Sequence, residues 1–208
     1  MGKQLIIFDM DGTLVNSSIT IANAINYVRE YLGFESLDSE MILRKVNDHS
    51  INPAQVFYHT EKFESIHERL FSEYYTKNHE GELVLYQGIM EMLQELKSRG
   101  VHLAVATNAY RNSTIESLSH LRINNFFDAV ACFDDVPNGK PHPDMLEKLL
   151  VDLGHTREQS LFIGDGPRDE MASKRANIPY IMVDWGFTEH ENAVRSVKEL
   201  QEILLRTI

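Results

Sequence analysis

The feature that most constrains this chain is its first apolar run, Leu5–Phe8, which ends at Asp9. Four consecutive apolar residues are too few for a buried helix and are typical of a strand buried in a parallel sheet. A second carboxylate, Asp11, follows two positions later, and Gly12 then permits a tight turn. Ordinary turns also carry such aspartates. Because ligand sites in open parallel sheets form where strands end, we expect Asp9 and Asp11 to project into a crevice.

Strand and helix patterns alternate through most of the chain. Short apolar runs at 101–106, 129–133, 160–163 and 180–183 predict four more strands, and the segments between them predict helices, one of which opens with a capping box at 113–116. This alternation indicates an α/β fold with a doubly wound, Rossmann-like parallel sheet. If the strand order is 3-2-1-4-5, the topological switch lies between the strands that end at Asp9 and Asp165. The order therefore brings these two aspartates together.

One helical insertion interrupts the alternation. Residues 16–80 carry amphipathic helix patterns and no convincing strand, so we predict a cap domain there and a catalytic core at 1–15 and 81–208. Because the insertion follows Asp11 directly, we expect it to act as a lid above the crevice. Its dense basic and polar cluster consists of Arg44, Lys45, Asn47 and His49. We predict that Arg44 and Lys45 bind substrate, although a solvated helix face is the simpler explanation of either residue taken singly.

The predicted crevice gathers the carboxylates of Asp9, Asp11 and Asp165. Their mutual repulsion in a partly dry site would cost several kcal/mol or force protonation, and a divalent cation is the natural compensation. Oxygen donors without nearby histidine or cysteine suit Mg²⁺ that retains several waters. The alternative is a surface acidic cluster that binds no metal.

A metal-bound phosphate ester gives the two N-terminal aspartates distinct chemical uses. Asp9 is a possible nucleophile, since carboxylates form aspartyl-phosphates in known enzymes. Asp11 could protonate the leaving oxygen and later deprotonate water, provided that its pKa is raised.

Later residues supply donors for a phosphoryl group. Thr107 ends a strand, so its hydroxyl and the next N–H, that of Asn108, could bind a phosphoryl oxygen. Lys140 lies in the turn-rich segment 138–143 and could provide the cation that a phosphoryl transition state needs. Asp169 could orient Lys140 or a metal-bound water. The simpler alternatives are a polar residue at a helix entry for Thr107 and a solvated loop lysine for Lys140.

These residues resemble, in order, the four motifs of the haloacid dehalogenase-like superfamily. The matching stretches are Asp9-Met10-Asp11-Gly12-Thr13, Thr107-Asn108, Lys140-Pro141, and Gly164-Asp165 with Asp169. The resemblance implies a nucleophilic role for the first aspartate and an acid/base role for the second. The insertion is similar to the small helical cap of the phosphoglycolate phosphatase and β-phosphoglucomutase subfamily. Gly166 departs from the pattern, since many relatives carry serine or aspartate there.

Composition narrows the range of partners. The 208 residues are 43% hydrophobic and 25% charged, as in ordinary soluble globular proteins, and no apolar run approaches membrane-spanning length. The net charge of -11 argues against nucleic acids and anionic membranes as partners. The single Cys132 excludes an internal disulfide and suggests a reduced cytoplasmic compartment. We expect a small phosphorylated substrate and a monomer or homodimer.

The leading prediction is a Mg²⁺-dependent phosphatase acting on a small phosphorylated metabolite through an aspartyl-phosphate. A phosphomutase of the β-phosphoglucomutase type would need the same residues and a lid that excludes water. A dehalogenase needs neither Mg²⁺ nor an acid at Asp11, so the sequence disfavours it. A catalytically idle binding protein with the same fold is a further alternative, against which the complete set of motif residues argues.

Overall fold

The computed structural model describes residues 2–46, 51–186 and 191–208. The chain forms two compact units. The first, here called the core unit, comprises Met1–Asn16 and Val84–Ile208, and the second, the helical unit, is Ser17–Leu83. No helix in the described part of the chain is both long enough and apolar enough to cross a bilayer.

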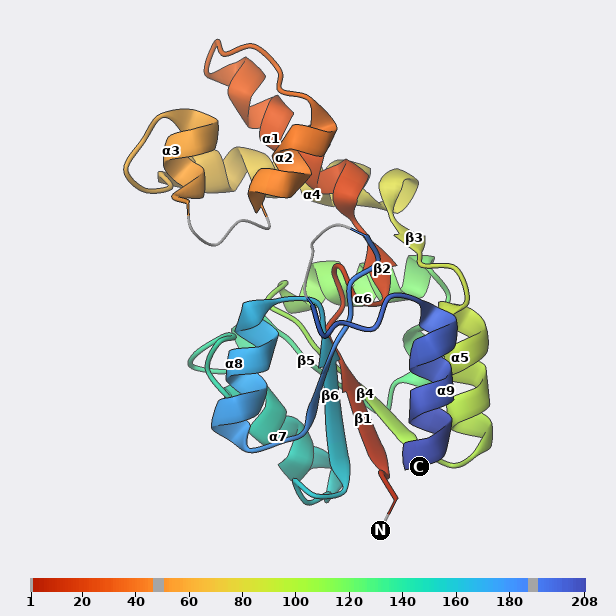
Figure 1. Cartoon of the computed structure of the whole chain (residues 1–208). Coiled ribbons are helices and arrows are strands. Elements are labelled where there is room, and N and C mark those ends of the chain that lie inside the picture. The colour runs from red at the N-terminus through yellow and green to blue at the C-terminus, as the bar shows by residue number, and fades with distance from the viewer. Residues whose placement is uncertain (1, 47–50, 187–190) are drawn as a thin grey trace. The chain divides into compact units, whose positions relative to one another are not determined.

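The core unit is built on a parallel five-stranded sheet in the order β5-β4-β1-β6-β7 (Figure 1). The strands are β1 (Leu5–Phe8), β4 (His102–Ala106), β5 (Ala129–Ala131), β6 (Ser160–Gly164) and β7 (Tyr180–Met182). Counted along the chain, this order is the predicted 3-2-1-4-5, so the predicted doubly wound sheet is confirmed. Phe8 pairs with Val105 of β4 and with Ile163 of β6. The three central strands therefore end at nearly the same level.

Helices cover both faces of this sheet (Figure 1). They are α5 (Ile89–Ser98), α6 (Arg111–His120), α7 (Asp144–Leu153), α8 (Pro167–Ala176) and α9 (Val197–Thr207), with short 3₁₀ turns η1 (Asn124–Phe126) and η2 (Phe133–Asp135). On the face covered by α7 and α8, buried side chains such as Leu5, Ile7, Leu149 and Phe162 form one apolar cluster. Each large apolar side chain buried in this way contributes about 1.5–3 kcal/mol, which holds the strand ends in place.

The start of α6 corrects one sequence expectation. The predicted capping box at 113–116 is wrong, because the helix begins two residues earlier, at Arg111. The Ser113 and Thr114 hydroxyls both donate to the Tyr110 carbonyl at 2.9 Å, inside the first turn. The Arg111 backbone N–H donates instead to Asp134 Oδ1 at 2.8 Å. A side chain from a different segment therefore caps this helix, which local spacing does not reveal.

The helical unit contains four helices in its described residues. They are α1 (Ser18–Tyr31), α2 (Ser39–Val46), α3 (Pro53–Tyr58) and α4 (Ser65–Glu82). Their shared core is apolar, with Ile25, Val28, Ile42, Phe57 and Leu70 among its buried residues. Two short strands of the core unit, β2 (Val15–Asn16) and β3 (Val84–Leu85), pair antiparallel. The chain leaves the core unit after β2 and returns to it at β3.

Candidate active site

Asp9 lies immediately beyond the carboxyl end of β1, in the middle of the sheet. Its backbone N–H donates to the Ile163 carbonyl at 2.8 Å, which continues the pairing of β1 with β6 by one residue. The residue is only 6% exposed. The buried strand pair therefore fixes the position of a carboxylate that would otherwise avoid the interior.

The chain turns sharply after Asp9. The Met10 carbonyl accepts backbone N–H groups from Thr13, Leu14 and Val15 at 3.3, 2.9 and 3.0 Å. Gly12 has φ of +85°, and a Cβ atom there would lie 2.1 Å from Asp165 Oδ2. Only glycine therefore allows the turn to approach Asp165 this closely.

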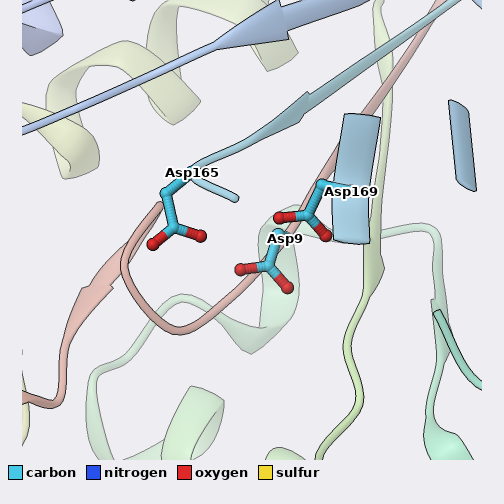
Figure 2. A group of neighbouring side chains, drawn as sticks. All are labelled: Asp9, Asp165 and Asp169. Carbon is cyan, nitrogen blue, oxygen red and sulfur yellow. The ribbon is translucent and has the colours of Figure 1, made fainter. Parts of the chain in front are cut away.

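Three carboxylates from two chain segments face one another at this edge, as Figure 2 shows. Oxygen atoms of Asp9, Asp165 and Asp169 all lie within 4.8 Å of one another. Asp11, which was predicted to join Asp9 and Asp165, is half-buried and is not part of this set. The third member, Asp169, comes from the first turn of α8. Asp11 still lies near enough for its charge to raise the pKa of Asp165 slightly, after burial and the charge of Asp169.

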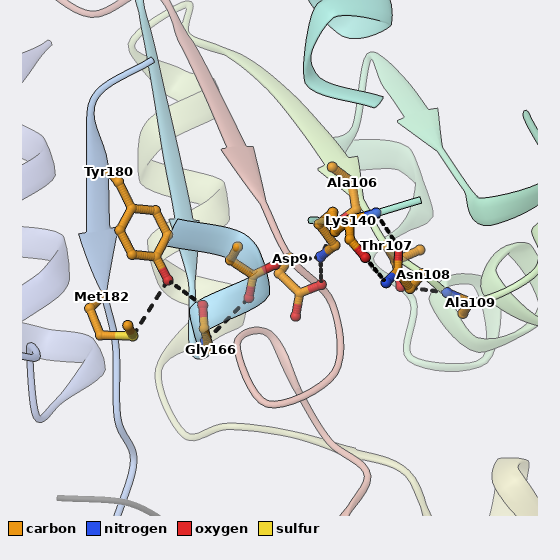
Figure 3. Close-up of polar contacts among 10 residues, drawn as sticks. Asp9, Ala106, Thr107, Asn108, Ala109, Lys140, Gly166, Tyr180 and Met182 are labelled. Carbon is orange, nitrogen blue, oxygen red and sulfur yellow. Dashed lines mark hydrogen bonds and ion pairs between the residues drawn. The ribbon is translucent and has the colours of Figure 1, made fainter. Parts of the chain in front are cut away.

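The first turn of α8 orients Asp169. Its Oδ2 accepts the Gly166 backbone N–H at 3.3 Å, as in a helix capping interaction. A Cβ atom at Gly164 would lie 2.6 Å from the Asp169 side chain, so the end of β6 must be glycine for this approach. On the other side of the turn, the Tyr180 hydroxyl lies 3.4 Å from both the Gly166 carbonyl and Met182 Sδ (Figure 3). Tyr180 is not predicted as a site residue, because its strand pattern marks it only as a core aromatic residue.

Lys140 is the buried cation of the site, with 7% of its surface exposed. Its ammonium group donates to Asp9 Oδ1 and to the Ala106 carbonyl, the latter at 2.9 Å (Figure 3). Asp169 Oδ1 lies 2.7 Å from the same nitrogen. The Phe162 ring lies beneath it, with the centroid at 5.6 Å. Lys140 thus joins the ends of β1 and β4 to the first turn of α8 through one charged group.

Asn108 fixes the backbone that carries Lys140. Its Nδ2 donates to the Lys140 carbonyl at 2.9 Å, and its Oδ1 accepts the Lys140 backbone N–H at 2.8 Å (Figure 3). A Cβ atom at Gly139 would lie 2.7 Å from Asn108 Oδ1, so the neighbouring residue must be small. Asn108 was predicted for substrate binding. Since its amide is occupied by Lys140, only its backbone N–H is suited to that use.

Thr107 lies next to this clamp and is 2% exposed. Its backbone N–H donates to the Ala131 carbonyl at 3.0 Å, which extends the pairing of β4 with β5. Its hydroxyl oxygen accepts the Ala109 backbone N–H at 3.1 Å, so the hydroxyl proton can be donated elsewhere. Thr107 therefore offers a donor at the same sheet edge as Asp9.

The charges of the site do not balance. Burial raises the pKa of Asp165 to about 7, and the neighbouring carboxylate of Asp169 adds to this increase. Burial also raises the pKa of Asp9 well above its ordinary value, although Lys140 opposes the increase. Burial alone would lower the pKa of Lys140, but Asp169 and Asp9 outweigh it and raise that pKa. Among the described residues of the cluster, one ammonium group thus faces three carboxylates.

This donor set fits a divalent cation. All three clustered side chains offer carboxylate oxygens, the donors that Mg²⁺ prefers. Asp169 and one oxygen of Asp9 are engaged by Lys140. Asp165 and the second oxygen of Asp9 are the groups suited to hold a metal ion. The glycine turn at residue 12 keeps the space beside Asp165 free of a side chain.

The two basic residues proposed for substrate binding, Arg44 and Lys45, belong to α2 of the helical unit. Arg44 forms an exposed ion pair with Glu40 at 2.5 Å, one helical turn away. Asn47 and His49, the other members of the predicted cluster, lie outside the described residues. Exposed pairs of this kind contribute little to stability, so this ion pair alone does not explain why the residue is arginine.

This chain is similar to known hydrolases both in sequence and in structure. Residues 6–183 match the family of haloacid dehalogenase-like hydrolases. Pyrophosphatase PpaX of Halalkalibacterium halodurans is 27% identical over 96% of this chain and 95% of its own length. A phosphoglycolate phosphatase of Pseudomonas putida is 30% identical over 88% of this chain and 70% of its own length. A haloacid dehalogenase-like family hydrolase of Streptococcus pneumoniae, 28% identical, superimposes with a TM-score of 0.80 and 98% of each chain covered.

Proposed function

Because this chain belongs to the haloacid dehalogenase-like hydrolase family, we propose that it is a Mg²⁺-dependent phosphatase that hydrolyses a small phosphorylated metabolite through an aspartyl-phosphate. The observation that carries this proposal is the buried Lys140, which contacts both Asp9 and Asp169 beside the carboxylate of Asp165. Burial of an unpaired lysine would destabilise the fold. Here the carboxylates of Asp9 and Asp169 offset that penalty, and phosphoryl transfer requires charged groups of this kind.

In the first step, a carboxylate oxygen of Asp9 forms a bond to phosphorus and the bond from phosphorus to the ester oxygen breaks. Lys140 donates to Asp9 Oδ1 and so holds the carboxylate in place for attack. Asp11 donates a proton to the departing oxygen. In the second step, water attacks phosphorus, Asp11 takes up a proton from that water, and inorganic phosphate leaves with Asp9 restored.

Donors from two segments would bind the phosphoryl oxygens. These are the Thr107 hydroxyl, the Asn108 backbone N–H and the Lys140 ammonium group, which the structure gathers at one sheet edge. Held in place before the reaction, they stabilise charge that spreads over the phosphoryl oxygens in the transition state. A Mg²⁺ ion held by Asp9 and Asp165 would neutralise charge on the same group.

We further propose that the inserted helices act as a cap that selects the substrate. The predicted cap spans 16–80, and the observed helical unit is Ser17–Leu83. Arg44 and Lys45 would contact the anionic part of a substrate away from the reacting phosphoryl group. The similar proteins named a pyrophosphatase and a phosphoglycolate phosphatase support a small, highly anionic substrate. We also expect a monomer or homodimer in the cytoplasm, and the buried free thiol of Cys132 supports only the reducing compartment.

Phosphate release from a panel of esters tests this function. The panel should include phosphoglycolate, pyrophosphate, sugar phosphates and nucleotides, each with Mg²⁺ and with a chelator. We expect activity only with Mg²⁺ and its loss in Asp9→Asn, with a folded variant. Full activity in chelator, or an Asp9→Asn rate above about one hundredth of wild type, would contradict the proposal, since acid/base help alone is worth about 10² to 10⁴-fold. An isomerised sugar phosphate among the products would indicate a phosphomutase instead.

A further inference from the structure

One tryptophan touches the turn that carries the proposed acid. The chain contains a single tryptophan, Trp185, which is half-buried and follows β7 by a few residues. Its indole Nε1–H donates to the Thr13 carbonyl at 3.0 Å. The two residues are 172 positions apart in the sequence. This contact therefore joins the C-terminal part of the core unit to the turn between Asp9 and β2.

The neighbours of Trp185 are fixed to the core, so the indole is not on a free loop. Asp184 accepts the Gly186 backbone N–H at 2.9 Å and forms an ion pair with Arg195 at 2.5 Å. The Asp184 backbone N–H donates to the Val194 carbonyl at 3.0 Å. The Asp184 side chain is 1% exposed, whereas that of Arg195 is 47% exposed, so the carboxylate is the buried part of this anchor.

The turn that Trp185 contacts is compact and close to the carboxylates. The backbone N–H groups of residues 13–15 donate to the Met10 carbonyl within this turn. The Gly12 N–H donates in addition to the Val15 carbonyl at 2.9 Å. The Tyr86 ring lies against the indole, with centroids 5.8 Å apart. After burial, the charges of Asp165, Asp11 and Asp184 raise the pKa of Tyr86, so this aromatic pair lies near the acidic site.

We propose that Trp185 is a positioning residue for Asp11, whose turn it holds through the Thr13 carbonyl. Asp11 lies two residues before Thr13, whose carbonyl accepts the hydrogen bond from Trp185. The other backbone hydrogen bonds of the turn restrict its conformation further. An acid must point at the departing oxygen when the bond to phosphorus breaks, and a small misplacement reduces the rate. The catalytic part of this inference rests on the proposed phosphatase function, whereas the anchoring part does not.

The variant Trp185→Phe tests both parts, because it retains an aromatic ring and removes the N–H donor. Hydrogen exchange followed by mass spectrometry should show about fivefold faster exchange in residues 10–15, as expected when one hydrogen bond is lost. Exchange in β1 and β6 should stay as in wild type. Tyr31→Phe, which removes a hydroxyl from an exposed side chain of the helical unit, is the matched control.

The catalytic part is tested with two esters of different leaving group. An alkyl phosphate needs a proton on its leaving oxygen, whereas an activated aryl phosphate does not. In Trp185→Phe, kcat/KM should fall about tenfold for the alkyl ester and less than threefold for the aryl ester. Equal losses on both esters would show a merely structural role and overturn the proposal.

The outcomes separate this inference from the proposed function. Unchanged exchange in residues 10–15 overturns the anchoring, whatever the kinetics show. If the wild type hydrolyses neither ester, the proposed function and the catalytic role of Trp185 both fail, and exchange alone decides the anchoring. Should Trp185→Phe not fold, incorporation of benzothienylalanine replaces the indole N–H by sulfur. Because the chain has one tryptophan, that replacement alters Trp185 alone.

Discussion

Replacing Asp165 with asparagine should stabilise the metal-free protein while it removes activity. In the folded protein, burial raises the pKa of this carboxyl from its ordinary value of 3.8 to about 7. Each unit of pKa corresponds to about 1.4 kcal/mol, so ionised Asp165 destabilises the fold by up to about 4 kcal/mol. Asparagine has nearly the same shape and carries no charge. Its amide also removes a charge that raises the pKa of Asp9.

The effect of Asp165→Asn on stability should depend on pH, because the pKa of Asp165 is raised in the folded protein. Below about pH 4 the carboxyl is protonated in both the folded and the unfolded chain, so the substitution should leave stability unchanged. Between pH 4 and 7 only the unfolded chain ionises, so the advantage of Asp165→Asn grows with pH. Above about pH 7 it should be constant.

Urea unfolding of metal-free protein at pH 4, 6 and 8 measures this effect. Asp152→Asn is the control, because Asp152 is an exposed carboxylate paired with Lys148 on α7 and should change stability by less than about 0.5 kcal/mol. Mg²⁺ at 100 times its Kd should add about 2.7 kcal/mol to wild type and much less to Asp165→Asn. A variant that is less stable than wild type at pH 8, or that gains as much from Mg²⁺, would refute the reasoning.

Four further substitutions test the remaining parts of the proposal. Lys140→Met should lower the free energy of unfolding by about 3–5 kcal/mol in urea at pH 8, because it leaves buried carboxylates without their cation, and phosphate release should stop. Asn108→Ala should cost about 1–3 kcal/mol and lower kcat more than it raises KM, because the backbone of Lys140 loses two hydrogen bonds; an unchanged kcat would show that the clamp is dispensable. Arg44→Ala or Lys45→Ala should raise KM for the preferred anionic substrate and leave hydrolysis of a small aryl phosphate unchanged, whereas equal losses on both would indicate that these residues support the fold.

Local sequence patterns determined the framework of this protein. Apolar runs too short for helices predicted the parallel strands, and their alternation with helices predicted the strand order that the structure confirms. Because strand ends in that order must meet at one edge, Asp9 and Asp165 could be placed together from the sequence. The strands can be predicted from side-chain periodicity, which is a local property of the sequence. The strand order can be predicted because strands and helices alternate along the chain.

Contacts between distant loops were decided by the tertiary structure alone. Asp169, and not Asp11, completes the carboxylate cluster of Asp9 and Asp165, and it does so from the first turn of α8. The Asn108 clamp and the Trp185 bond to Thr13 join residues 32 and 172 positions apart. Such contacts leave no periodic pattern in the sequence, since each hydrogen bond needs only one donor residue and one acceptor residue. Their pairing depends on how the loops beyond the sheet edge fold over one another, which becomes defined only when the whole core is packed.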